Sequence, residues 1–257
     1  MKPLKDILNE SLLNESLLDD EDELFDRNDK TLVELWIKKN YKLHGTLEIY
    51  EDKHGFVVDS GDDVEVTNKN IKSLTNGMFR WGEIIGELDC SECNRLISLE
   101  GAPKECGRFV CSKCTGLRTL EGAPKKCYSF DCSGCDELRS LEGAPNECVW
   151  FDCSGCVKLT SLEGSLKNCD IFDCSSCTGL MTLKGAPNEC YTFNCEKCTK
   201  LRTLKGAPNK CEDFNCSGCI KLTSLEGVPN KYTQIECKSC PNLIITDDDR
   251  KKYKIKS

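Results

Sequence analysis

The feature that most constrains this chain is a strict 21-residue repeat marked by cysteine. The 22 cysteines fall into three series, and each series advances in steps of 21 residues. One runs from Cys90 to Cys237, a second from Cys93 to Cys240, and a third from Cys106 to Cys211. A unit this short cannot bury its apolar side alone, so the units must stack and share one continuous core. The sequence therefore predicts an elongated array.

The unit formed by residues 127–147, CYSFDCSGCDELRSLEGAPNE, shows the role of each position. Numbering Cys127 as position 1, apolar or sulfur-bearing side chains fall at positions 1, 4, 6, 9, 12 and 15. Positions 4 and 6 alternate as in a β-strand and face the same side. Gly143 and Pro145 break any helix and turn the chain back. Position 14 is Ser or Thr from Ser98 to Ser224, which predicts a hydroxyl that binds a turn amide.

This pattern, L-x-x-L-x-L-x-x-C-x-x-L-x-x-L, resembles the leucine-rich repeat and covers residues 85–246 in eight tandem units. The resemblance implies a repeat solenoid with a parallel β-sheet on one face. Because 21 residues leave little room for a helix, we expect an irregular or 3₁₀ return on the other face. The phrase Ser-Leu-Glu-Gly-Ala-Pro at 98–103 and 140–145 is similar to short leucine-rich-repeat proteins of tailed bacteriophages and related bacteria. The leader Leu-Leu-Asp-Asp-Glu-Asp at 17–22 also resembles the N-terminal segments of phage proteins. That similarity implies a recognition or structural scaffold.

The segments outside the array lack the repeat, and those before it are predicted to form an α+β N-terminal cap. Residues 1–41 are expected to be a helical acidic leader, with helices over 3–18 and 30–40. In the second helix Asp29 is the expected N-cap, and the side chains expected to face inward are Leu32, Leu35, Trp36 and Ile37. Residues 42–84 are expected to be rich in β-strands, at 47–49, 56–58 and 64–66, followed by a degenerate repeat at Ile71 and Leu74. Residues 247–257 are expected to be a frayed, charged C-terminal tail.

Charge and composition exclude several classes of function. A formal net charge of −8 disfavours binding to nucleic acid or anionic lipid. The sequence contains no run of about 18 apolar residues that would predict a membrane span. The N-terminus shows no secretory signal, so we expect a cytoplasmic protein with reduced thiols. A phage protein would act in the host cytoplasm or the virion. His44 and His54 are the only histidines, which argues against most acid–base and Cys/His catalysis and predicts a protein that is not an enzyme.

The paired cysteines allow two main interpretations. The spacing C-x₂-C-x₁₇-C-x₂-C matches zinc sites, with Cys90, Cys93, Cys111 and Cys114 as the first candidate set for zinc or an iron–sulfur cluster. However, sites shared by two units would imprint a double-length repeat, and the sequence has only the single one. Ile85 and Tyr232 replace position 1 at the array ends, where they would fill a core but could not bind zinc. We therefore favour packed free thiols without metal. Disulfides within the C-x-x-C pairs are a third interpretation.

The solvent-facing strand positions are the candidate functional surface, because solenoids bind through them. Position 5 gives a row of polar side chains, and position 3 gives an apolar pair; the predicted partner-binding residues are Asp131, Trp150, Asp152, Ile171, Asp173 and Asn194. The acidic row is either a solvated face, a docking surface for a basic segment, or a weak divalent-cation site. We expect a non-enzymatic scaffold that recognises another protein through its sheet face. The alternatives are a metal–thiolate protein and a phage structural component.

Overall fold

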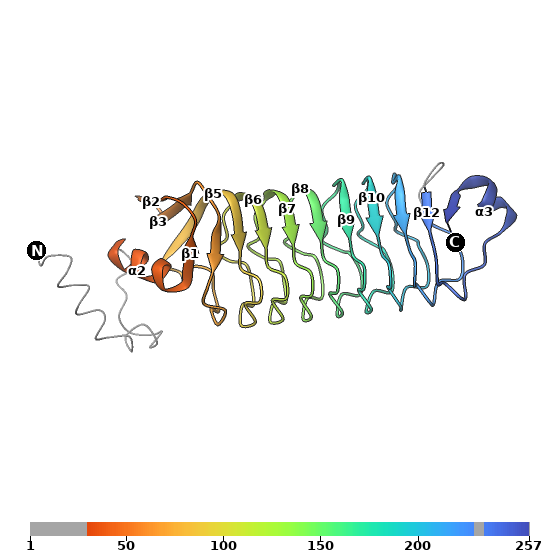
Figure 1. Ribbon diagram of the computed structural model, residues 1–257, viewed down its shortest axis with the longest axis horizontal. Helices are drawn as coiled ribbons and strands as arrows, with labels where there is room; N and C mark the ends of the chain where they lie inside the picture. The colour runs from red at the N-terminus through yellow and green to blue at the C-terminus, as the bar shows by residue number, and fades with distance from the viewer. Residues whose placement is uncertain (1–29, 229–233, 257) are drawn as a thin grey trace, which may run out of the picture.

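The chain folds into a parallel β-solenoid of about nine turns, with its strands side by side along one long axis (Figure 1). This computed structural model describes residues 30–228 and 234–256. Strand neighbours in the array are equivalent residues 21 positions apart, such as Cys106, Cys127 and Cys148. The repeating, parallel-sheet architecture predicted from the cysteine spacing is confirmed.

One sheet of 13 strands runs the length of the described chain, in the order β1-β4-β5 and then consecutively to β13, while β2 pairs with β3 and β3 with β5. The N-terminal elements are α2 (Lys30–Asn40), β1 (Tyr41–Leu43), β2 (Leu47–Asp52), β3 (Gly55–Ser60) and β4 (Val64–Val66). The strands of the array are β5 (Phe79–Asp89), β6 (Glu105–Val110), β7 (Lys126–Asp131), β8 (Glu147–Asp152), β9 (Ile171–Asp173), β10 (Thr192–Asn194), β11 (Asp213–Asn215) and β12 (Gln234–Glu236). The C-terminal elements are α3 (Asp247–Lys252) and β13 (Lys254–Lys256). Between the array strands, the described return segments consist of turns and irregular backbone.

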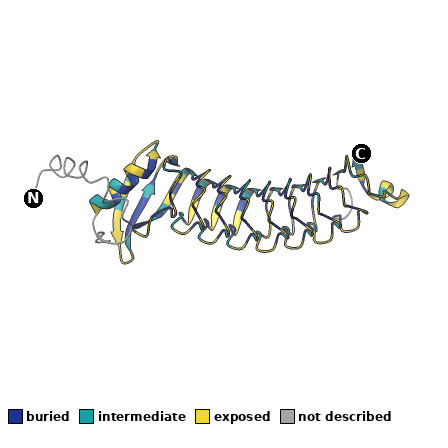
Figure 2. Cartoon of the chain, turned by 90° about the horizontal axis from the view of Figure 1, so that it is seen from below, coloured by how far each residue is buried: buried dark blue, intermediate teal, exposed yellow. Residues whose placement is uncertain are grey.

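The core is built from columns of identical side chains, and the same burial pattern recurs from turn to turn (Figure 2). At position 4, phenylalanine rings stack nearly parallel, with centroids 5.3–5.5 Å apart and interplanar angles of 2–14°. The column contains Phe109, Phe130, Phe151, Phe172, Phe193 and Phe214. Leu88 and Ile235 continue it at its ends and are also buried. Offset stacking of aromatic rings adds to the free energy of burial in each turn.

The cysteines at positions 6 and 9 face the core, as predicted, and all 22 cysteines carry free thiols. The position-9 thiol donates a hydrogen bond to the backbone carbonyl of the position-6 cysteine one turn earlier. Cys114 Sγ lies 3.1 Å from the Cys90 carbonyl oxygen, and the equivalent distances along the array are 3.1–3.3 Å. The thiol therefore acts as a small apolar side chain that also satisfies a buried acceptor.

One expected core residue lies on the surface. The register of β5 against β6 shifts between Ile84 and Glu87, which places Ile84, not Ile85, opposite Cys106. Ile84 is fully buried, whereas Ile85 is 66% exposed. The prediction that Ile85 fills position 1 was therefore wrong, because the irregularity moves its side chain out of the core. Its counterpart at the other end, Tyr232, lies outside the described residues.

The N-terminal elements agree with the predicted helix over 30–40 and the three predicted strands. In α2, Trp36 and Ile37 are buried as expected, but Val33 takes the inward place expected of Leu32 and Leu35, which are half-buried. Ile71 and Leu74 are also buried. The predicted helix over 3–18 and the Asp29 N-cap lie outside the described residues.

The C-terminal segment is structured, contrary to the prediction of a frayed tail. Thr246 begins α3 with a capping box: its hydroxyl accepts from the Asp249 amide at 3.1 Å, and the Asp249 carboxylate accepts from the Thr246 amide at 2.9 Å. Tyr253 is buried, and β13 then pairs in parallel with β12. Reciprocal capping and strand pairing together satisfy the backbone groups that fraying would expose.

The predicted role of position 14 is confirmed in most turns. The side-chain hydroxyl accepts from the backbone amide two residues on, at 3.2–3.4 Å. The acceptors are Thr119, Ser140, Thr182, Thr203 and Ser224. Each bond fixes the turn before the left-handed glycine, such as Gly143 at φ 90°.

We predict that Phe151→Ala destabilises the array by about 3–5 kcal/mol, because it leaves a cavity and interrupts the ring column at both neighbours. Phe151→Leu should cost less, since leucine fills more of the site. Urea denaturation followed by circular dichroism measures both changes. Wild-type stability in the alanine variant would contradict the role assigned to this column.

Candidate functional site

A groove of about 630 Å³ opens over β5–β8, and we call it the sheet-face groove. Its floor comes from Gly86 and Gly107, which occupy position 2 in two consecutive turns. A Cβ atom on Gly107 would lie 2.5 Å from the Ile85 carbonyl oxygen, so the floor has no room for a side chain. The next turn places Tyr128 at the same position. The hollow therefore lies beside Tyr128, next to two turns whose position 2 carries no side chain.

The walls of the groove carry large apolar side chains that face solvent. Ile85 and Tyr128 are each 66% exposed, and Trp150 is 48% exposed. Scattered exposed apolar residues are ordinary on a protein surface, but these three line a single depression. Exposed aromatic side chains gathered in this way are typical of protein-binding hot spots.

The groove is acidic. Asp63, Glu87, Asp131 and Asp152 line it together with one cation, Arg108, which leaves a formal charge of −3. The Arg108 guanidinium is already engaged, with Nη1 3.1 Å from Glu87 Oε2. Burial raises the pKa of the Glu87 carboxyl, against the opposing effect of Arg108. The excess of negative charge therefore favours a cationic ligand.

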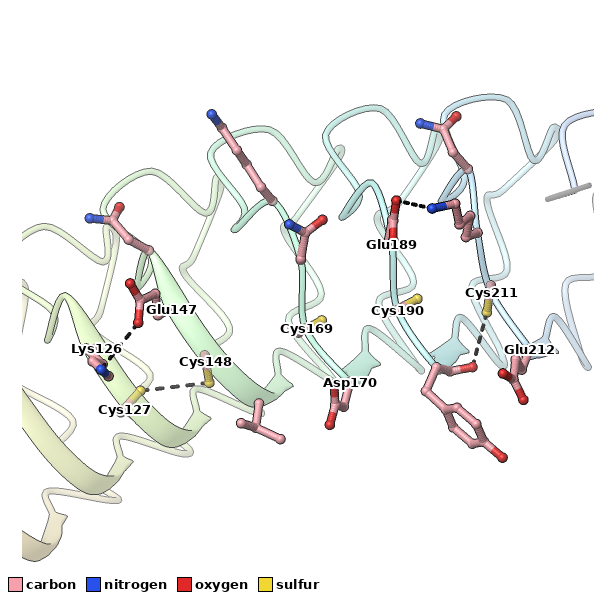
Figure 3. A pocket seen from close by; sticks show the side chains of 17 residues that line it. Lys126, Cys127, Glu147, Cys148, Cys169, Asp170, Glu189, Cys190, Cys211 and Glu212 are labelled. Atoms are coloured by element: carbon pink, nitrogen blue, oxygen red, sulfur yellow. Dashed lines mark hydrogen bonds and ion pairs between the residues drawn. The ribbon is translucent and has the colours of Figure 1, made fainter.

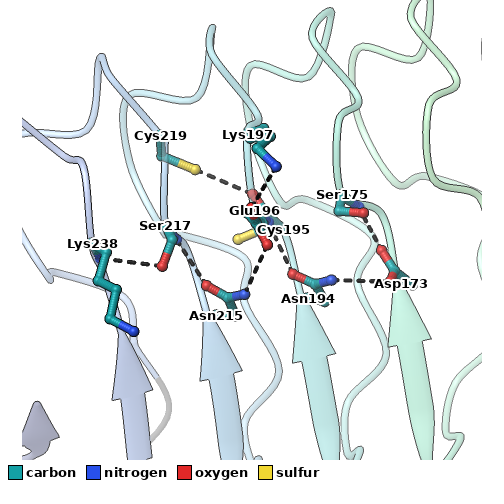
Figure 4. A network of polar contacts seen from close by, with 10 residues as sticks. All are labelled: Asp173, Ser175, Asn194, Cys195, Glu196, Lys197, Asn215, Ser217, Cys219 and Lys238. Carbon is teal, nitrogen blue, oxygen red and sulfur yellow. Dashed lines mark hydrogen bonds and ion pairs between the residues drawn. The ribbon is translucent and has the colours of Figure 1, made fainter. Parts of the chain in front are cut away.

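The position-5 side chains have a structural role that the sequence analysis did not predict. Each of Asp131, Asp152, Asp173 and Asn194 accepts, through Oδ1, the backbone amide two residues on at 2.7–3.1 Å. Figure 4 shows this network from Asp173 onward. Asn194 Nδ2 also donates to Asp173 Oδ2 at 3.0 Å, so an amide replaces a like-charge contact there. The row closes a turn after each strand and is half-buried rather than fully solvated.

Asp152 has an unfavourable position within this row. Burial raises its pKa, and repulsion from Asp173 and Asp131 raises it further, while hydrogen bonds from Ser154 oppose the shift. Cross-strand like charges of this kind destabilise a sheet. The charged form of Asp152 is therefore the one that a bound cation would relieve.

The structure brings three of the six predicted binding residues into the groove: Asp131, Trp150 and Asp152. Ile171 and Asp173 lie on the neighbouring strand, directly opposite Trp150 and Asp152, and both are half-buried. Asn194 lies one turn further away. The sequence analysis missed Asp63, Ile85, Glu87 and Arg108, together with the glycine floor. Consecutive glycines at position 2 were the available signal for the hollow.

The alternative metal residues Cys90, Cys93, Cys111 and Cys114 are all fully buried. Cys90 Sγ donates to the Val110 carbonyl at 3.2 Å, and Cys114 donates to the Cys90 carbonyl. The thiol contact with Cys114, together with burial, raises the pKa of Cys93. Within residues 30–228 and 234–256, no group of three or more His, Cys, Asp or Glu side chains is arranged to hold a metal ion.

Comparisons with protein-family models, with curated proteins and with solved structures found no match to this chain. None of the helices in the described part of the chain has the length and apolar character needed to cross a membrane.

We predict that Asp152→Asn stabilises the protein at pH 7 by about 0.2–1 kcal/mol, since it keeps the acceptor for Ser154 and removes the charge. The raised pKa means that the folded state binds more protons than the unfolded state just above the ordinary value of 3.8. Wild-type stability should therefore fall as pH rises through that window, whereas the asparagine variant should not show this loss.

Urea denaturation at pH 3 and pH 7 measures both effects, and the difference between the proteins should vanish at the lower pH. Asp152→Ala is the control, because it removes both the charge and the acceptor and should be less stable than Asp152→Asn throughout. An asparagine variant less stable than wild type at pH 7 would show that the carboxylate is favourable in its charged state.

Proposed function

We propose that this chain is a non-enzymatic scaffold of the leucine-rich-repeat type that recognises another protein through the sheet-face groove. The observation that carries the proposal is the gathering of Ile85, Tyr128 and Trp150, all well exposed, around one acidic hollow. Apolar anchors supply affinity in such sites, and charge complementarity selects the partner and speeds association.

The proposed partner is an extended segment with a Lys or Arg side chain. Gly86 and Gly107 line the groove without side chains, which leaves room for an extended backbone beside Tyr128 and Trp150. A cation placed beside Trp150 could contact an aromatic face and the carboxylates of Asp131 and Asp152 together. Such a contact would relieve the repulsion within the acidic row.

Within this proposal, residues 30–84 cap the N-terminal end of the core. In support, Trp36, Tyr41, Phe79 and Trp81 form a ring cluster with centroids 5.3–5.9 Å apart, next to the first repeats. The proposal also takes the protein to act in the cytoplasm, or in the host cytoplasm or virion if it is phage-encoded. The host-cytoplasm and virion alternatives follow from the sequence resemblance described above.

Binding of labelled, extended peptides, basic and acidic, tests the proposal by fluorescence anisotropy. We expect basic peptides with an aromatic or aliphatic neighbour to bind, and added salt to weaken them. Tyr128→Ala or Trp150→Ala should each reduce affinity about 30-fold and the double variant about 10³-fold, because each side chain is expected to act as a hot spot worth about 2 kcal/mol. Trp150→Ala with Asp152→Lys should abolish binding by also reversing a charge.

Tyr191→Ala is the matched control, since Tyr191 also occupies position 2 and is 53% exposed but lies outside the groove. It should bind like wild type. Equal loss in the Tyr191 and Tyr128/Trp150 variants, or preference for acidic peptides, would show that the groove is not the recognition site.

A further inference from the structure

A second groove, of about 1000 Å³, runs along the array where each strand begins, and its floor carries a row of cysteines (Figure 3). We call it the thiol groove. The thiols are those of position 1, namely Cys127, Cys148, Cys169, Cys190 and Cys211, and Cys106 continues the row one turn earlier. Their side chains are 6–9% exposed, whereas most of the cysteines at positions 6 and 9 are fully buried. Solvent therefore reaches every member of this series along one open groove.

We propose that the thiol groove binds soft monovalent metal ions of the Cu(I) class, each held by two cysteines from adjacent turns. Soft thiolate ligands select such ions. A metal–sulfur bond is about 2.3 Å long, so an ion midway between two sulfurs needs them about 4.6 Å apart. That separation is close to the strand spacing of about 4.8 Å that the in-register sheet imposes on equivalent side chains.

Neighbouring thiols of the row already contact each other. Cys127 Sγ lies 3.8 Å from Cys148 Sγ, and the thiol of Cys190 interacts with that of Cys211. A small rotation of either side chain opens the gap to the separation that an ion needs. A disulfide would instead require the sulfurs to approach to about 2.05 Å and the Cβ atoms to come closer than one strand spacing.

The geometry of a single row also selects the coordination number. Zinc requires four ligands in a tetrahedron, and six sulfurs along one line cannot surround a point. A two-coordinate ion needs only neighbours, which the row supplies at every step. Binding replaces two thiol protons: two RSH and Cu⁺ give [Cu(SR)₂]⁻ and two H⁺.

The thiols now make bonds that coordination would replace. Cys148 donates to the Trp150 carbonyl at 2.9 Å, and Cys211 donates to the Asp213 carbonyl at 3.1 Å. The groove walls carry four carboxylates and three lysines, a formal charge of −1; the carboxylates are those of Glu147, Asp170, Glu189 and Glu212. Glu147 and Glu189 pair with Lys126 and Lys210, which leaves Asp170 and Glu212 to attract a cation.

Two triple variants, each retaining three position-1 thiols, test the proposal. In the alternating variant, Cys127→Ser, Cys169→Ser and Cys211→Ser leave Cys106, Cys148 and Cys190, none of them in adjacent turns. In the contiguous variant, Cys106→Ser, Cys127→Ser and Cys148→Ser leave Cys169, Cys190 and Cys211 as neighbours. Cu(I) is added without oxygen, in competition with a chromophoric chelator, after circular dichroism has shown that each variant is folded.

The contiguous variant should bind one Cu(I) tightly, with two sulfur ligands by X-ray absorption. The alternating variant should bind about 10²–10⁴-fold more weakly, because one thiolate no longer places its neighbour at high effective concentration. Equal affinity of the two variants would overturn the proposal. So would three or four sulfurs around each copper in the wild type, since the ions would then sit among the buried thiols.

Discussion

The constraint on which the whole structure depends is in-register parallel stacking of units of equal length. Each side chain in the array lies one strand spacing from the equivalent side chain of the next turn. A residue type that recurs at one position therefore packs against copies of itself. Apolar side chains gain from this arrangement, as the phenylalanine column shows. Charged side chains lose, because a column of identical charges repels. The sequence varies mainly where repetition would be unfavourable.

The surface columns show how the chain avoids that repulsion. Lysine in one turn pairs with glutamate 21 residues away, as in Lys126–Glu147, Lys184–Glu163 and Lys210–Glu189, where nitrogen–oxygen distances are 2.6–3.5 Å. In the position-5 column, asparagine follows aspartate at Asn194 and turns a repulsive contact into a hydrogen bond. Such exposed pairs add little stability individually. Their main effect is to remove an unfavourable interaction from each step of the stack.

The 21-residue period made most of the array predictable. Departures of the array from that period could not be predicted. Periodicity alone located the strands, the inward thiols and the position-14 turn bonds, because each rests on spacing that eight units share. The exposure of Ile85 could not be predicted from the repeat, because the irregular register of β5 depends on its pairing with β3, β4 and β6. The Thr-x-x-Asp pattern of the capping box at Thr246 and Asp249 is present in the sequence. The charged residues that follow it favoured the prediction of a solvated tail. The sheet-face groove could be predicted only from the placement of Gly86 beside Gly107 in adjacent strands.

The two grooves differ in a way that follows from the same constraint. The thiol groove exists because position 1 is cysteine in every turn from Cys106 to Cys211. It therefore presents a row of evenly spaced thiols. The sheet-face groove exists because position 2 changes from glycine to tyrosine between Gly107 and Tyr128, while Trp150 appears only once at position 3. A regular column presents many equivalent sites and suits a small ion. A break in the columns makes one place unlike the others, which is what recognition of a single partner requires.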